Sequence, residues 1–153
     1  MLKDHFIHQF KYNDWATKKA AESFIGFEEK DERLNELLSH IISSQKVWLS
    51  RTLLRDIYIN PWEKYSTQKC IELSTEITAE WINLLEGFSD IDFEKRIDYK
   101  NTKGEKFVNT VLDIAAHIIN HSTYHRGQIA QKVRALGGTP AVTDYIFYQR
   151  EFY

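Results

Sequence analysis

Apolar residues recur at the spacing of an α-helix in four stretches of the chain, and polar segments separate these stretches. A period of three to four residues places such side chains on one face of a helix, where they can build a common core. The pattern predicts helices over about residues 2–24, 30–56, 67–88 and 110–136. Only two prolines and six glycines interrupt the 153 residues, which favours long helices.

Breaks in the pattern indicate where these helices begin and end. Gly26 follows the first helix, and Pro61 limits the second because the residue before a proline is kept out of helical geometry. Thr110 and Asp113 have the spacing of a capping box, in which two side chains satisfy backbone N–H groups at the start of a helix. Gly137 then suits the C-terminal end of the fourth helix.

Two segments outside the helices have patterns of their own. Residues 89–109 form a long connection, and polar and apolar positions alternate within it around residues 101–104, which predicts a short β-hairpin. The tail, residues 139–153, is rich in aromatic side chains, and we expect it to fold back onto the helices because burial of aromatic rings is favourable. The predicted fold class is therefore all-α, a four-helix bundle that forms one domain over residues 1–153.

Composition and charge exclude several classes of function. The formal net charge is −2 and no cluster of lysine or arginine is present, so we expect no nucleic-acid partner, because phosphate recognition needs a basic surface. No apolar run has the length that spans a bilayer, so we expect no membrane partner. Cys70 is the single cysteine, which excludes an internal disulfide and a cysteine-rich metal site. These features predict a soluble, cytoplasmic protein.

Histidines repeat at four-residue intervals in the fourth predicted helix, as His117, His121 and His125. Residues four apart lie about 40° from each other around a helix, so two such imidazoles can reach one metal ion. On the helical projection His121 and His125 lie closer to the apolar face than His117, which makes them the better pair. His40 is the single histidine of the second predicted helix and the candidate third ligand, although it lies off the centre of that helix's apolar face. Hydrogen-bonded histidines without a metal fit the same spacing, so the residues alone leave both readings open.

Polar residues near these histidines have candidate supporting roles. We expect Asn120 and Gln128 to hydrogen-bond the imidazoles and orient them, because metal-binding histidines usually have such partners. Arg126 projects to the other side of the apolar face, and we expect it to tie the helix to the C-terminal tail. Neither a Ser-His-Asp arrangement nor a glycine-rich phosphate loop is present, so no residue is assigned as catalytic.

Four segments of the chain resemble the DinB/YfiT-like family of helical proteins, in the same order and over nearly the whole length. Near the start, FKYNDWATKK is similar to the family's YN-x-WA segment. The segment LLSHIISSQKVWLSR resembles the one that carries the family's first metal-binding histidine. NHSTYHRGQI matches the signature N-H-x3-H-R-G-Q, and TPAVTDYIFYQRE is similar to the closing TD-x-I-x-Y segment.

The resemblance implies a site and a fold. It places the metal ligands at His40, His121 and His125, and it implies a bundle with a long crossover before the fourth helix. Three neutral imidazoles suit one divalent metal ion, and zinc or nickel is expected.

The resemblance also implies an activity. Related proteins include metal-dependent thiol S-transferases that use low-molecular-weight thiols such as bacillithiol, and metal-dependent hydrolases. We therefore expect a small-molecule substrate, with a low-molecular-weight thiol as the candidate, and a homodimer. The alternative is a non-catalytic metal-binding module or scaffold related to stress.

Overall fold

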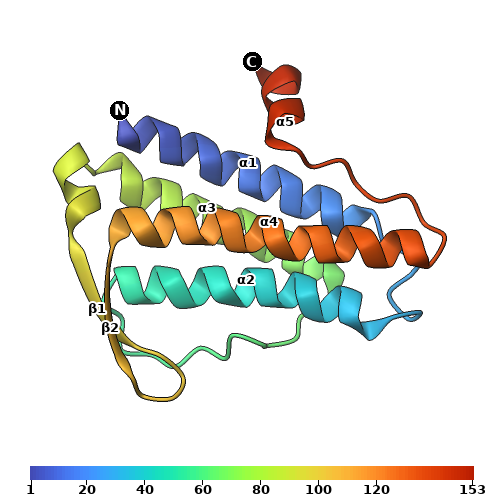
Figure 1. Ribbon diagram of the computed structural model, residues 1–153, viewed down its shortest axis with the longest axis horizontal. Helices are drawn as coiled ribbons and strands as arrows, with labels where there is room; N and C mark the ends of the chain where they lie inside the picture. Colours follow the sequence, from blue (N-terminus) through green and yellow to red (C-terminus); the bar gives the residue numbers. More distant parts are fainter.

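The computed structural model describes residues 1–153 and shows a bundle of four long helices (Figure 1). The bundle helices are α1, Leu2–Glu22; α2, Glu32–Thr52; α3, Thr67–Glu86; and α4, Val111–Ala135. A short helix, α5, spans Tyr145–Phe152. All four predicted helices are present, and the predicted all-α fold class is confirmed.

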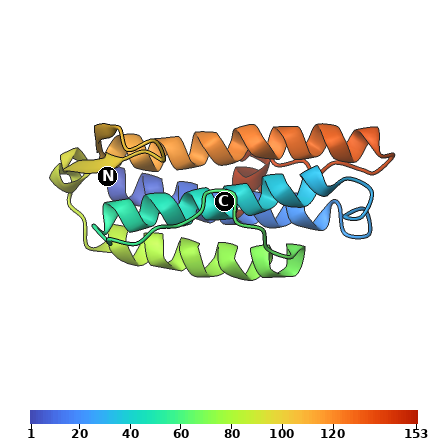
Figure 2. The same ribbon diagram turned by 90° about the horizontal axis from the view of Figure 1, so that it is seen from below.

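The order of the helices differs from a simple up-and-down bundle. Helices α1 and α4 run in one direction, and α2 and α3 run in the other (Figures 1 and 2). Both α1 and α2 pack against α3 and α4, so α1 lies diagonally across the bundle from α2. Residues 53–66 run along the bundle to join the parallel helices α2 and α3. Residues 87–110 carry the chain across one end to α4, as the crossover expected before the fourth helix.

Helix α2 ends at Thr52, earlier than the pattern predicts. Leu54 has a φ of 54°, in the left-handed region, and its N–H donates to the carbonyl of Arg51 at 3.1 Å. The N–H of Arg55 donates to the carbonyl of Ser50 at 2.9 Å, which completes a Schellman motif. Glycine usually occupies this position because a side chain is strained there. With a leucine in its place, the sequence contains no signal for this helix end.

The long connection before α4 contains the predicted β-hairpin. Strand β1, Arg96–Lys100, pairs antiparallel with β2, Lys106–Thr110, and a 3₁₀ helix, η1, Asp90–Glu94, precedes them. Gly104 lies in the turn with a φ of 81°, which glycine adopts readily. The Asn101 side chain closes the turn by accepting hydrogen bonds from two backbone N–H groups.

One hydrophobic core of 24 buried residues fills the bundle. Within it, the rings of Phe10 and Trp81 stack with their centroids 4.9 Å apart. The predicted capping box is present at the start of α4, where the Thr110 hydroxyl accepts a hydrogen bond from the Asp113 N–H at 3.1 Å. The Asp113 carboxylate accepts in return from the Thr110 N–H at 3.2 Å. None of the helices is both long and apolar enough to cross a membrane.

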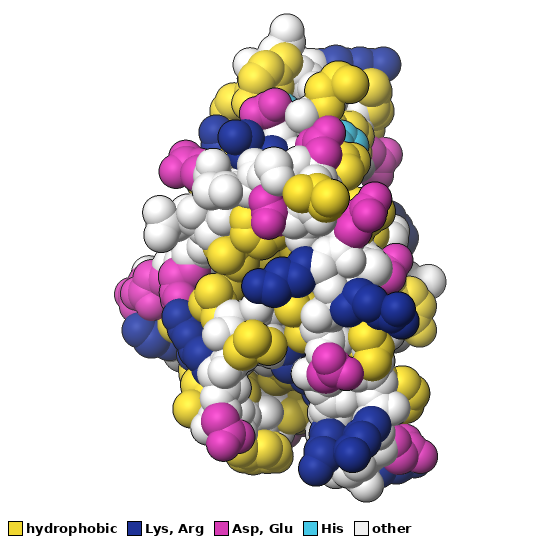
Figure 3. Space-filling model, turned by 90° about the vertical axis from the view of Figure 1, so that its left-hand side faces the viewer, with side chains coloured by type: hydrophobic (Ala, Val, Ile, Leu, Met, Phe, Trp, Pro, Cys, Tyr) yellow, Lys and Arg dark blue, Asp and Glu magenta, His cyan; other side chains and the backbone are white.

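The C-terminal tail folds back onto α1 of the bundle. Tyr148 is buried, and its ring packs on Tyr12 and Trp15 with centroids 5.7 and 5.3 Å apart. Other residues of the tail also contact α1, since Tyr145 packs on Tyr12 with ring centroids 5.1 Å apart and Tyr153 packs on His8 at 4.6 Å. These residues are more exposed than Tyr148, and hydrophobic side chains are seen at the top of Figure 3. The expectation that the tail folds back onto the bundle is therefore correct, although Tyr148 is its only buried aromatic side chain. The exposed aromatic residues are Tyr145, Phe147, Phe152 and Tyr153.

Candidate metal centre

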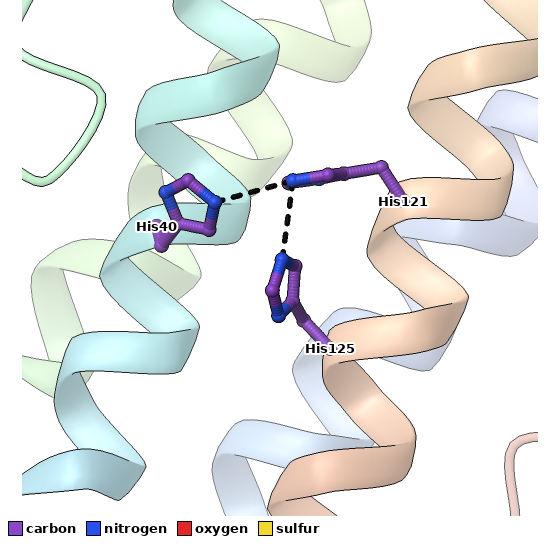
Figure 4. Close-up of side chains that lie close together, drawn as sticks. All are labelled: His40, His121 and His125. Carbon is purple, nitrogen blue, oxygen red and sulfur yellow. Dashed lines mark hydrogen bonds between the residues drawn. The ribbon is translucent and has the colours of Figure 1, made fainter.

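Three histidine side chains converge in the space between α2 and α4 (Figure 4). Helix α2 supplies His40, and α4 supplies His121 and His125 one turn apart. The Nε2 atom of His121 lies 3.2 Å from Nε2 of His40 and 3.2 Å from Nε2 of His125. One ligand atom from each side chain lies within 4.8 Å of the other two, so the three imidazoles can reach a single ion.

Hydrogen bonds to two oxygens fix the orientation of two of these rings. The Nδ1 atom of His40 lies 2.7 Å from the backbone oxygen of Pro61, and Nδ1 of His125 lies 2.7 Å from Oε1 of Gln128. A carbonyl oxygen can only accept, so each Nδ1 carries the hydrogen and donates it. In the neutral ring the lone pair is then on Nε2, which faces the other histidines.

Burial of two of the rings favours the neutral form that binds metals. Burial lowers the pKa of His40 below its ordinary value of 6.5. Burial, followed by the proximity of His125 and His40, lowers the pKa of His121 to about 3. Converging lone pairs repel one another unless a proton or cation lies between them, and His121 can share one hydrogen with only one neighbour at a time. The donor set therefore fits a divalent cation.

Residues of the connection between α2 and α3 complete the site. The ring of Trp62 stacks on His40 with centroids 3.7 Å apart and an angle of 7° between the planes. The guanidinium of Arg33 lies over the same indole, 5.1 Å from its centroid. No sequence pattern indicates that Pro61 and Trp62 belong to the site, because a loop residue distant in sequence contacts His40 only when the chain is folded.

The residues expected to support the histidines have different positions. Gln128 hydrogen-bonds His125, as its place one turn further along α4 allows. Asn120 is exposed and forms no hydrogen bond with the three histidines, so no contact supports the orienting role expected for it. The reason is geometric, since adjacent residues point about 100° apart around a helix and Asn120 directly precedes His121. His117 lies outside the cluster, with its ring packed on Trp48 at 5.2 Å.

Arg126 is buried and ties α4 to α1. Its guanidinium donates to the Asn13 side chain at 2.6 Å and to the Thr123 hydroxyl at 2.9 Å. It also lies 3.4 Å from the Tyr12 hydroxyl, which in turn donates to the backbone oxygen of Thr143 in the tail. The expected link from this arginine to the C-terminal tail thus runs through Tyr12.

Comparison with known proteins identifies the family. The sequence model of the DinB family matches residues 4–151, nearly the whole chain. The chain belongs to the DinB family. Protein DinB of Bacillus subtilis (strain 168) is a DinB relative that is 26% identical over 165 residues, which cover 96% of this chain and 95% of the relative.

The fold also resembles a solved DinB-like structure. The crystal structure of a DinB-like protein from Bacillus cereus has a TM-score of 0.68 and 20% sequence identity, covering 91% of this chain and 95% of that one. At this identity the likeness shows the fold alone. In this DinB-family bundle, the segment that matches the family signature lies on α4 and contains His121, His125 and Gln128.

Proposed function

We propose that this DinB-family protein binds one divalent metal ion through Nε2 of His40, His121 and His125, and that zinc or nickel occupies the site. The proposed activity is a metal-dependent transfer of the thiol S-transferase type, or a hydrolysis, on a small-molecule substrate. A low-molecular-weight thiol is the candidate substrate. The observation that carries the metal proposal is the convergence of three Nε2 atoms, two of them on rings whose Nδ1 is bound to a carbonyl oxygen.

The number of ligands supports an enzyme over a scaffold. The cluster contains three histidines, and no aspartate, glutamate or cysteine joins them. Structural zinc sites are usually closed by four protein ligands, whereas catalytic sites have three and leave a position for water or substrate. The chemistry that such an ion supplies is Lewis-acid activation of water or a thiol at neutral pH.

The protein's own groups hold the ligands in place. The Pro61 carbonyl and the Gln128 amide oxygen orient His40 and His125 and increase the electron density on their rings. Trp62 covers one face of His40 while remaining 45% exposed, so it limits the motion of that ring without sealing the site from solvent.

The first experiment is elemental analysis of protein purified without a histidine tag. We expect about one equivalent of zinc or nickel in the wild type and loss of the metal in His121→Ala. His117→Ala is the matched control, because His117 lies one turn away on the same helix and outside the cluster. Absence of metal from the wild type, even after dialysis against zinc or nickel, contradicts the proposal.

Activity is tested separately from metal binding. Steady-state assays with several thiols and electrophiles, and with hydrolysable esters and amides, compare metal-loaded protein with protein stripped by a chelator. The proposal expects turnover only in the loaded form. Equal rates in the two forms would remove the metal-dependent mechanism. No turnover in either form, together with bound metal, would favour the non-catalytic scaffold.

A further inference from the structure

A cavity of about 640 Å³ lies beside the bundle, outside the three histidines. Its walls are the second half of α2, residues 54–61 of the following connection, and residues 98–102 of the hairpin. Sites for small organic ligands typically have volumes of roughly 300–1,000 Å³. This cavity therefore has the size of a binding site for one small molecule.

One wall of the cavity presents an arginine without a counter-ion. Arg51 is held between the rings of Trp48 and Tyr99, with its guanidinium carbon 4.6 and 4.5 Å from their centroids. Its Nη2 donates to the backbone oxygen of Lys100 at 3.1 Å, and no carboxylate lies within ion-pair distance. Burial lowers the pKa of Arg51, yet a guanidinium remains charged at neutral pH. A half-buried guanidinium whose position is fixed by two aromatic rings can bind an anionic group with little loss of conformational freedom.

The other charged residues of the cavity limit what this receptor accepts. Arg55 already pairs with Glu80 at 3.2 Å. Lys100 also lines the cavity but is exposed, so Arg51 is the half-buried cation of the site that has no ion pair. Asp56 and Asp98 also line the cavity and are exposed. Their negative charge disfavours a ligand with several acidic groups, because like charges repel. The arrangement therefore selects a single anionic group near Arg51.

Apolar side chains also line the cavity. Leu54, Ile57 and Tyr58 line the cavity and are 67%, 58% and 82% exposed, respectively. Large apolar side chains that face solvent around a concave surface commonly mark a binding site. Burial of these side chains against an apolar ligand would remove that surface from water.

The cavity extends to the neighbourhood of the three histidines. Ser44 and Pro61 both line it, and both contact Nδ1 of His40, with the Ser44 hydroxyl at 3.5 Å and the Pro61 oxygen at 2.7 Å. A molecule bound in the cavity would thus contact two residues that also contact His40, one of the three proposed metal ligands.

We propose that this cavity binds a small molecule that has one carboxylate or phosphate group and an apolar body, and that Arg51 recognises the anionic group. The further statement that such a molecule is the substrate rests on the function proposed above. The binding itself does not depend on it.

The test uses phenyl phosphate and benzoate as probes, with benzyl alcohol as the uncharged analogue. Each is titrated into full-length, metal-free protein and followed by ¹H–¹⁵N NMR, so that no ion at the histidines can recruit the anion. We expect saturable binding of one or both anions, which also distinguishes phosphate from carboxylate, and much weaker binding of benzyl alcohol. No saturable binding of either anion, or equal affinity for the alcohol, would overturn the proposal.

Variants assign the recognition to Arg51. Arg51→Gln should weaken anion binding by at least about tenfold, because hydrogen bonds to charged groups are the strong ones. Arg51→Lys retains the charge without the forked geometry and should weaken it less. Arg134→Gln is the matched control, since Arg134 is exposed in the last turn of α4 and lies outside the cavity. Unchanged anion affinity in Arg51→Gln contradicts the assignment.

Zinc uptake, measured on the same preparations, separates the two proposals. Anion binding by a protein that takes up no zinc supports the cavity site and contradicts the proposed metal function. Zinc uptake without anion binding supports the metal site and contradicts the cavity site. A normal thermal melt of Arg51→Gln shows that lost anion binding is not lost folding.

Discussion

At the scale of single residues, two oxygens determine which nitrogens face the space between α2 and α4. The Pro61 carbonyl accepts from Nδ1 of His40, and the Gln128 amide accepts from Nδ1 of His125, each at 2.7 Å. Without these bonds either ring could rotate or adopt its other tautomer. The preorganisation of the site therefore depends on residues that would not bind the ion.

Gln128 offers the cleaner test of this preorganisation, because Pro61 acts through its backbone. Gln128→Ala should weaken zinc or nickel affinity by about 10- to 100-fold, since loss of such a partner frees the ligand ring. The dissociation constant is measured by competition with a chromophoric chelator. Gln131→Ala, at an exposed position on the same helix, is the control and should change nothing. Equal affinities in the two variants would contradict the role of Gln128.

Cys70 gives a prediction about pH. Burial raises the pKa of its thiol from 9.0 to about 11, so the folded protein holds the proton over a range in which the unfolded chain releases it. The free energy of unfolding should therefore fall as pH rises from 9 towards 11, by up to about 1.4 kcal/mol per pH unit. Urea unfolding at several pH values should show a flatter dependence in Cys70→Ala. Tyr148, whose pKa is raised to about 12, contributes equally to the pH dependence of stability in both proteins. An identical pH dependence in the wild type and in Cys70→Ala would show that the thiol does not titrate in this way.

At the scale of elements, α4 contributes most to the proposed metal site because it carries two of the three clustered histidines. Its start is fixed by the capping box of Thr110 and Asp113, directly after the hairpin. The site begins about two to three turns further along, where the helix is already regular. A change that destabilises the first turn of α4 should therefore leave the geometry of the histidine cluster unaffected.

Thr110→Ala tests this separation. Loss of the cap should lower the free energy of unfolding by about 1 kcal/mol, measured by urea denaturation. Thr75→Ala, on the exposed face of α3, is the control and should not destabilise the protein. Metal affinity of folded Thr110→Ala should remain that of the wild type. A loss of affinity comparable to that of Gln128→Ala would show that the cap also positions the histidines.

At the scale of the whole molecule, the histidine cluster joins helices that are far apart in the chain. His40 and His121 are separated by 81 positions, and α2 and α4 pack side by side in the bundle. An ion held by both helices binds the folded state only, so binding adds directly to the stability of the fold.

Thermal melts measure this contribution. With free zinc at 100 times its dissociation constant, the gain is about 2.7 kcal/mol, which corresponds to a rise in Tm of roughly 5–10 °C for a chain of this length. Addition of a chelator should reverse the rise. His121→Ala should melt at the same temperature with and without zinc. A zinc-dependent rise that persists in this variant would place the ion elsewhere.

Features that depend on neighbouring residues could be predicted from the sequence. The four helices, the hairpin and the capping box follow from local periodicity and spacing. The pairing of His121 with His125 belongs to the same class, because residues four apart on a helix always lie on one face. The end of α2 at Thr52 is the local exception, since Leu54 takes the left-handed position after the helix that glycine usually occupies.

Features that depend on which surfaces pack together could be recognised only in the folded chain. His40 lies off the centre of its helix's apolar face, and it joins the other histidines only because α2 packs beside α4. The positions of Trp62 on His40 and of Arg51 between Trp48 and Tyr99 are likewise set by connections that return to the bundle. Periodicity records which way a side chain points from its own helix and contains nothing about the element that will face it. The sequence thus determines the elements and the local histidine pair, while packing of distant segments brings in the third histidine, the residues that orient it and the cavity.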